Sequence, residues 1–229
     1  MVLPKRTALY LALAVIVAGW VRRIYNLRAF AVIPNTFGEL VRTIVIGKIV
    51  VAAILILLLR LQRQGAADIG LRREHWLRQI ITGTAIGLAM FLALNVALDS
   101  AMRAIFPVAP TTDPSINVYF ADPRHLLAWL PIGIFGGGVV EELERIFVFT
   151  RFEQWLGRPG LMLGVILSSA MFGLGHLYQG IGAVISTGIS GVVFALVYLR
   201  RRSALEAISA HAFSDVLAML GATFMMPHT

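Results

Sequence analysis

Long apolar runs alternate with short polar connections along the whole chain. A membrane-spanning helix needs about 20 mostly apolar residues, because each residue rises 1.5 Å. Runs near this length cover residues 7–21, 41–59, 80–98, 126–149, 161–177, 181–199 and 205–224. Lipid offers backbone groups no hydrogen-bond partner, and the runs lack the strict alternation of barrel strands. The pattern predicts an all-α fold, a polytopic transmembrane bundle of about seven helices.

Composition agrees with a lipid environment. Of the 229 residues, 58% are apolar and 14% are charged, whereas soluble domains average about 45–50% and 25%. After seven spans, too few residues remain for a separate soluble catalytic domain. The chain has no cysteine, which excludes disulfides, thiolate metal sites and cysteine nucleophiles.

The net charge of +8 comes from Lys and Arg residues that lie between the apolar runs. This placement is typical of membrane loops, and no basic motif with interleaved aromatic residues predicts a nucleic-acid partner. Assigning alternate loops to opposite sides gives twelve positive residues on one side and six on the other. Because positive loops stay in the cytoplasm, we expect a multi-pass protein of the inner (plasma) membrane with a cytoplasmic N-terminus.

Ionisable residues are concentrated within the later runs. A charge at the bilayer centre costs at least about 2.5–3.5 kcal/mol, so such groups persist mainly where they pair or function. The candidates are Glu141, Glu142, Glu144 and Arg145 in the fourth run, Ser168, Ser169 and His176 in the fifth, and His211 and Asp215 in the seventh.

Helical spacing predicts how the first group is arranged. At about 100° per residue, Arg145 projects between Glu141 and Glu142 and can hold one of the two charges. The other carboxylate suits a general base that activates water. Lys48 in the second run is expected to snorkel or to bond between helices rather than to line the site.

The two histidines can reach the same region. Glu141 lies sixteen residues before Gly157, and His176 lies sixteen residues after Gly160, so an antiparallel hairpin brings both to one level. His211 and Asp215 are four apart and share a helical face, so Asp215 can orient the imidazole or share a ligand with it.

Three motifs in this order resemble the CAAX-protease and bacteriocin-processing (CPBP) family of intramembrane proteases. They are Glu141-Glu142, Phe172-x-x-x-His176 and His211-x-x-x-Asp215, and the resemblance covers about residues 125–224. It implies two segments: N-terminal transmembrane helices in 1–124 and the catalytic core in 125–229. It also implies that one glutamate activates water, the histidines position or polarise it, and a peptide bond near the membrane surface is cleaved.

Two departures from the family pattern keep alternatives open. The family has its arginine at the position of Ile146, one residue beyond Arg145, which is compatible with a tolerated variant or with lost activity. The family's last motif ends in Asn, whereas Asp215 cannot donate to an oxyanion when ionised, which favours an orienting or metal-ligating role.

The candidate residues are compatible with a mechanism that uses a metal ion and with one that does not. Glu141, His176, His211 and Asp215 include the two histidines and a carboxylate of catalytic Zn sites, and another divalent ion is a second option. A serine protease needs a base next to Ser168 or Ser169, and His176 is seven residues from Ser169 on the same run.

Three functions follow from these patterns. The first is an endopeptidase whose partners are a peptide or membrane-protein substrate and the lipid bilayer. The second is a non-catalytic protein of the same fold, acting in bacteriocin immunity or partner binding. The third is an ion-coupled transporter in which the buried acids and histidines form a relay, although the chain lacks paired broken helices in matching halves.

Overall fold

The computed structural model describes residues 4–25, 36–106 and 119–225, and within these ranges every regular element is a helix. The all-α bundle predicted from the sequence is confirmed. The long helices are α1 (Lys5–Tyr25), α3 (Phe37–Leu61), α4 (Trp76–Met90), α8 (Glu142–Leu174), α9 (Ile181–Arg201) and α10 (Ala204–Met225). The shorter elements are η1 (Ala66–Ile69), η2 (Phe91–Leu98), α5 (Asp99–Ile105), η3 (Pro123–His125), α7 (Leu126–Pro131), η4 (Ile132–Glu141) and η5 (Leu177–Gln179).

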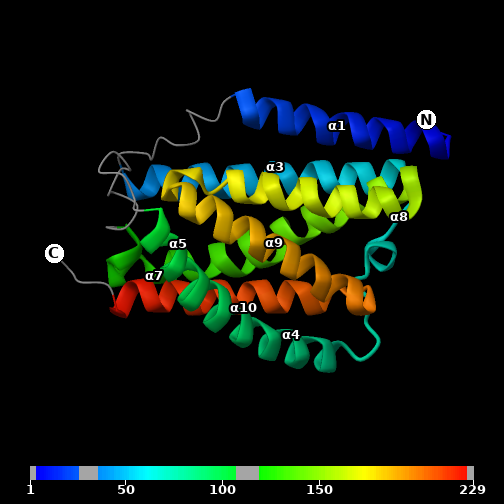
Figure 1. Ribbon diagram of the computed structural model, residues 1–229. Coiled ribbons are helices and arrows are strands. Elements are labelled where there is room, and N and C mark those ends of the chain that lie inside the picture. Colours follow the sequence, from blue (N-terminus) through cyan, green and yellow to red (C-terminus); the bar gives the residue numbers. More distant parts are fainter. Residues whose placement is uncertain (1–3, 26–35, 107–118, 226–229) are drawn as a thin grey trace.

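Among the described residues, six helical stretches are long and apolar enough to cross a membrane, and they contain the predicted runs except for the end of the fifth, residues 175–177. The fourth and fifth runs lie in one stretch, Pro123–Leu174, in which the chain reverses at Gly157. Gly157 has φ +66° and ψ −144°, a conformation that glycine adopts without the steric cost of a side chain. Figure 1 shows the two arms of α8 running back along each other from this turn. The chain is therefore a multi-pass membrane protein with the predicted hairpin.

The helix ends follow from local sequence. Thr36 caps α3 by accepting a hydrogen bond from Glu39 N at 3.3 Å. Ser203 does the same for α10, where Glu206 N donates to its Oγ at 3.1 Å. Gly175 ends α8, and its N–H donates to the carbonyls of Met171 and Phe172.

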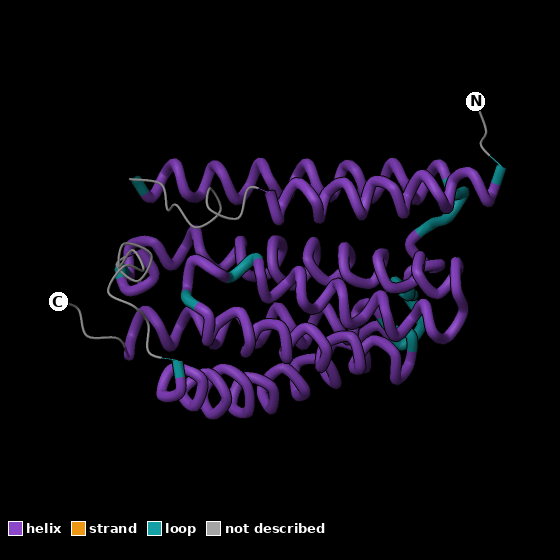
Figure 2. The backbone as a smooth tube through the Cα atoms, turned by 45° about the horizontal axis from the view of Figure 1, so that its top comes forward, coloured by secondary structure: helices purple, strands orange, loops and turns teal. Residues whose placement is uncertain are grey.

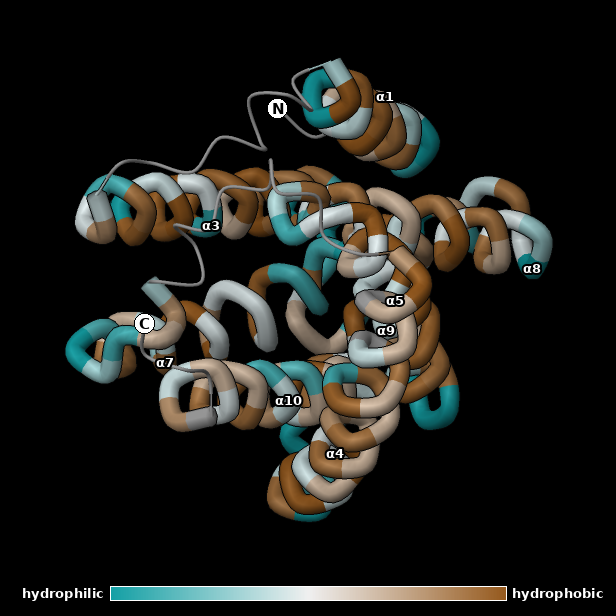
Figure 3. The backbone as a smooth tube through the Cα atoms, turned by 60° about the vertical axis from the view of Figure 1, so that its left-hand side comes forward, coloured by the Kyte–Doolittle hydropathy of each residue, from teal (hydrophilic) through white to brown (hydrophobic). Residues whose placement is uncertain are grey.

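The outer helices present apolar side chains to the surroundings. The middle of α3 carries Val45, Ile46, Ile49 and Val50, which are 40–62% exposed, as lipid-facing residues should be. Figure 2 shows the helices arranged side by side with their connections at the ends. In Figure 3, hydrophilic positions gather at helix ends and in the space between α3 and α10.

Glycines allow α10 to lie close to two neighbours. A Cβ at Gly83 or Gly87 of α4 would lie about 2.4–2.5 Å from backbone oxygens of α10. A Cβ at Gly138 of η4 would lie 2.5 Å from the Cβ of Ala212. Small residues let membrane helices pack backbone to backbone, which brings η4 and α10 together.

Several chain reversals meet at one end of the bundle. Ala204 N donates to Gly70 O at 3.0 Å, and Arg202 forms an ion pair with Glu153 near the hairpin turn. The connection that follows α3, the α8 turn and the α9–α10 turn therefore share one end (Figure 1). This is the alternation of loops that the charge count assumed.

Candidate active site

The two adjacent glutamates lie where the helix type changes. Glu141 is the last residue of η4, a π-helix, and Glu142 is the first residue of α8. The angular offsets of an α-helix do not hold across a π-helical segment, whose hydrogen bonds run from i to i+5. Arg145 forms an ion pair with Glu142, which agrees with the prediction that it can hold one of the two charges, and Glu141 has a separate partner, Lys48.

Glu142 is fully buried and belongs to a chain of polar contacts. Its Oε2 accepts a hydrogen bond from Arg145 Nη2 at 3.1 Å, and its Oε1 lies 2.9 Å from His211 Nδ1. The other ring nitrogen of His211, Nε2, lies 3.5 Å from Asp215 Oδ1. A carboxylate accepts and does not donate when ionised, so His211 is oriented from both sides by acids. The predicted pairing of His211 with Asp215 on one helical face is present in the structure.

Glu141 pairs with a different cation. Lys48 of α3 donates to its Oε1, and the side chain of Glu141 remains 22% exposed. Lys48 was expected to snorkel or bond between helices, and its interhelical bond goes to a residue of the site. Of the two glutamates, only Glu141 has a partly exposed side chain.

His176 lies just beyond the end of α8, not within a helix as the fifth run predicted. The glycines at 173 and 175 end the helix at Leu174, and His176 Nδ1 lies 3.0 Å from Phe172 O. A carbonyl only accepts, so Nδ1 carries the proton and Nε2 is left with its lone pair free. Burial lowers the pKa of His176 below its usual 6.5, because a buried ring disfavours the charged form.

Tyr178 is a neighbour of His176 that the sequence interpretation did not include. Its ring stacks on that of His176, with centroids 6.0 Å apart. Its hydroxyl oxygen accepts from Gln179 Nε2 at 3.0 Å, so the hydroxyl hydrogen is free to be donated. Burial raises the pKa of Tyr178 to about 12, which keeps the hydroxyl protonated.

Aromatic rings surround Arg145 and His211. The guanidinium carbon of Arg145 lies 5.1 Å from the ring centroid of Phe172 and 5.6 Å from that of Phe194. Phe194 also stacks on His211, with ring centroids 4.4 Å apart. Phe194 was missed because one aromatic residue in an apolar run gives no signal of its own.

The displaced arginine still reaches the glutamate pair. Spacings of three and four residues share a helical face, so Arg145 contacts Glu142 much as a residue at 146 would. Ile146, at the position where the family has arginine, is fully buried in the apolar core.

Gly137 of η4 leaves room for the Asp215 carboxylate of α10. A Cβ at Gly137 would lie 2.1 Å from Asp215 Oδ2 and 3.7 Å from His211 Nε2. Any larger residue at 137 would therefore displace the Asp215 carboxylate.

The remaining polar candidates do not form a second site. Ser168 donates to Val165 O within its own helix, and Ser169 packs against Gly191 with no hydrogen-bond partner among the described residues. Neither serine has a base beside it in the part of the chain that the structure describes. Glu144 lies within electrostatic range of Arg23 and Lys48.

The donors do not converge as a metal-ligand set. Within the described residues, no group of three His, Asp or Glu side chains is arranged to hold a metal ion. His211 has Nδ1 against Glu142 and Nε2 facing Asp215. The arrangement does not fit the predicted set of Glu141, His176, His211 and Asp215 around one ion.

An apolar cavity of about 280 Å³ has walls from α3, α7 and η4. Lys48, the partner of Glu141, is one of its lining residues. Ile49, Ile132 and Phe135 are among the lining residues.

A comparison with protein families matches only the part of the chain that contains this site. Residues 123–217 match a family model described as type II CAAX prenyl endopeptidase, Rce1-like, and the matched segment holds all six candidate residues. No curated protein and no solved structure matches the chain. The resemblance to the CAAX-protease family that the three motifs indicated is thereby confirmed over residues 123–217.

Proposed function

We propose that this chain is an intramembrane endopeptidase that hydrolyses a peptide bond near the membrane surface, with Glu141 as the general base. The observation that carries this proposal is the difference between the glutamates. Both oxygens of Glu142 have partners, whereas Glu141 is partly exposed and has one oxygen paired with Lys48.

In the proposed reaction, Glu141 takes a proton from a water molecule, and the water oxygen attacks the peptide carbonyl carbon. The carbon–nitrogen bond then breaks, and the proton passes from Glu141 to the leaving amine. His176 Nε2, with its free lone pair, accepts a hydrogen bond from the water and fixes its position.

The oxyanion that forms on the peptide carbonyl oxygen needs hydrogen-bond donors to stabilise it. Lys48 supplies an ammonium beside Glu141, and Tyr178 supplies a hydroxyl that donates no hydrogen bond to the described residues. Asp215, unlike the Asn of the family pattern, serves to orient His211 in this mechanism.

The network of Glu142, Arg145 and His211 has a supporting role. It is buried, and it ties the start of α8 to α10 across the bundle. The displaced arginine was the feature that favoured a non-catalytic protein of the same fold. Because Arg145 reaches Glu142, its position supports the catalytic interpretation.

We propose no step through a metal ion, since the donors do not gather around one point. The proposed partners are a peptide or membrane-protein substrate and the bilayer, with the apolar cavity beside Lys48 holding an apolar part of the substrate. The proposed location is the inner membrane with a cytoplasmic N-terminus, on the charge asymmetry of the loops.

The test is cleavage of a library of membrane-proximal peptides by the purified protein in detergent, followed by mass spectrometry. Cleavage by the wild type supports the proposal if Glu141→Gln abolishes it and the exposed Glu39→Gln does not. A folded wild type that cleaves no peptide would favour the non-catalytic role instead.

A further inference from the structure

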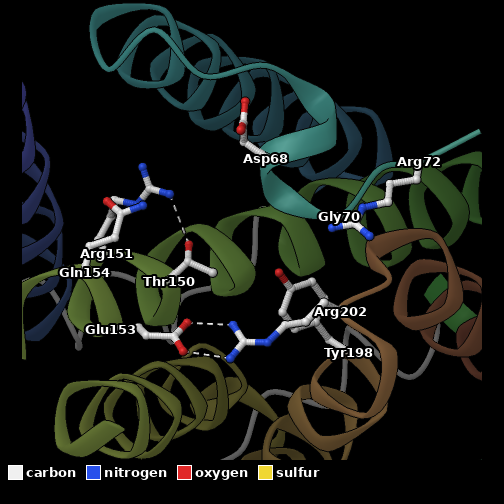
Figure 4. Close-up of a pocket in the computed structure, with 9 residues that line it drawn as sticks. All are labelled: Asp68, Gly70, Arg72, Thr150, Arg151, Glu153, Gln154, Tyr198 and Arg202. Carbon is white, nitrogen blue, oxygen red and sulfur yellow. Dashed lines mark hydrogen bonds and ion pairs between the residues drawn. The ribbon is translucent and has the colours of Figure 1, made fainter. Parts of the chain in front are cut away.

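A second cavity lies at the end of the bundle where the chain reversals meet. It has a volume of about 430 Å³, within the range of small-ligand pockets. Its walls come from η1 and the segment after it, the first arm of α8, the end of α9 and the α9–α10 turn (Figure 4). The lining residues are Asp68, Gly70, Arg72, Thr150, Arg151, Glu153, Gln154, Tyr198 and Arg202.

Arg151 is the unusual member of this cavity, because it is fully buried. Its Nη1 donates to the side-chain oxygens of Gln62 and Gln64, and its Nη2 donates to Thr150 Oγ1 at 3.3 Å. Its Nε has no hydrogen-bond partner among the described residues. All of these partners are neutral, so the guanidinium charge is buried without an anion in contact, which is costly.

The other charges of the cavity do not supply that anion. Glu153 is already held by Arg202 through two hydrogen bonds of 2.6 and 2.7 Å. Asp68 Oδ2 accepts from Gly65 N at 2.7 Å, and its carboxylate acts on Arg151 through space without forming an ion pair in direct contact among the described residues. Arg72 is exposed at the cavity and adds a further positive charge.

The walls of the cavity are held in place. Gly70 has φ +86°, and a Cβ there would lie 2.4 Å from Arg202 O. The Gly70–Ala204 backbone hydrogen bond and the Arg202–Glu153 pair fix the same corner. A preformed site loses little entropy when a ligand binds.

The geometry points to a phosphate-binding site: we propose that a phosphate group occupies this cavity between Arg72 and the Nε–Nη2 edge of Arg151. A guanidinium edge presents two parallel N–H donors that match two phosphate oxygens. The cavity lies at helix ends, the level at which lipid headgroups surround a multi-pass protein, so the phosphate belongs either to an anionic lipid or to a soluble phosphate. This site is separate from Glu141 and does not depend on the proposed function.

The experiment measures binding to the whole purified protein in detergent, through the shift of the thermal unfolding midpoint. The probes are dioctanoyl phosphatidic acid, dioctanoyl glycerol as its phosphate-free counterpart, and inorganic phosphate against chloride at equal ionic strength. We expect a saturable rise with phosphatidic acid and none with dioctanoyl glycerol. A rise with inorganic phosphate as well assigns the site to the phosphate group alone, whereas a rise with phosphatidic acid only assigns it to a lipid.

Single substitutions distinguish phosphate binding in this cavity from attraction by the net positive charge of the protein. Arg151→Gln should weaken the apparent affinity about tenfold or more, which corresponds to about 1.4 kcal/mol. Arg72 is exposed, and its side chain forms no hydrogen bond or ion pair with the described residues, so Arg72→Gln repeats the test if Arg151→Gln does not fold. Arg158→Gln is the matched control, because Arg158 is exposed near the same turn and does not line the cavity.

Two results would overturn the proposal. One is that neither phosphate-bearing probe raises the midpoint of the wild type. The other is that Arg158→Gln weakens binding as much as Arg72→Gln and Arg151→Gln do, which would make the effect one of net charge.

Discussion

His211 Nδ1 lies 2.9 Å from Glu142 Oε1, although 69 positions separate the two residues in the chain. This contact joins α10 to the start of α8, and Arg145 holds the opposite oxygen of the same carboxylate. Both carboxylate oxygens of Glu142 are thus used in contacts that hold the helices together. Glu141 is the acid of the pair whose side chain remains partly exposed.

Glu142→Gln should destabilise the protein. The change leaves the buried Arg145 without its carboxylate, and breaking a buried pair in this way costs about 3–5 kcal/mol. Thermal unfolding in detergent measures the loss, with the exposed Glu39→Gln as the control for removing one negative charge. An unfolding midpoint equal to that of the wild type would show that the pair does not stabilise the bundle.

Lys48 is expected to act as a positioning residue for Glu141. Lys48→Met removes the ion-pair partner of that carboxylate, so kcat should fall about tenfold or more while KM changes little. Lys48→Arg keeps a positive donor and should restore most of the rate. If Lys48→Met changed KM alone, Lys48 would act in substrate binding rather than on Glu141.

The burial of His176 predicts a dependence of stability on pH. Its folded pKa lies below 6.5, because burial outweighs the attraction of Glu141. The unfolded chain therefore binds a proton that the folded chain does not, and stability is fully present above pH 6.5 and declines as the pH falls below it.

The measurement is the unfolding midpoint of wild type and His176→Gln between about pH 8 and pH 5. The difference between the two should shrink as the pH falls, because the variant has no proton to gain at this position. A constant difference across the range would contradict the assignment of a neutral, buried His176.

Removal of metal ions should leave activity unchanged. The acids and histidines of the site do not converge on one point, and His211 is occupied by two carboxylates. Cleavage is measured before and after dialysis against a chelator. Loss of activity that added zinc restores would overturn this prediction and would imply a rearranged site.

Much of the fold could be predicted because it depends on local pattern. The apolar runs predicted the membrane-spanning helices, and Gly157 predicted the turn that folds α8 into a hairpin. The equal length of the two arms predicted that His176 lies at the level of Glu141, and in the structure the Phe172 ring contacts both His176 and Arg145, four residues after Glu141. These features follow from span length, glycine geometry and helical rise.

The pairing of Glu141 with Lys48 could not be predicted in the same way. Lys48 lies 93 positions away on a helix outside the family motifs, and no local pattern relates the two. The π-helical segment that ends at Glu141 could not be predicted either, because no local pattern in this apolar run distinguishes it from an α-helix.

The role of Glu141 is tested most directly by the kcat of Glu141→Gln for a peptide that the wild type cleaves, measured on protein shown to be folded. Removing a general base should lower kcat by about 10²- to 10⁴-fold, with the unfolding midpoint close to that of the wild type. Cleavage by Glu141→Gln at the wild-type rate would contradict the assignment of Glu141 as the base.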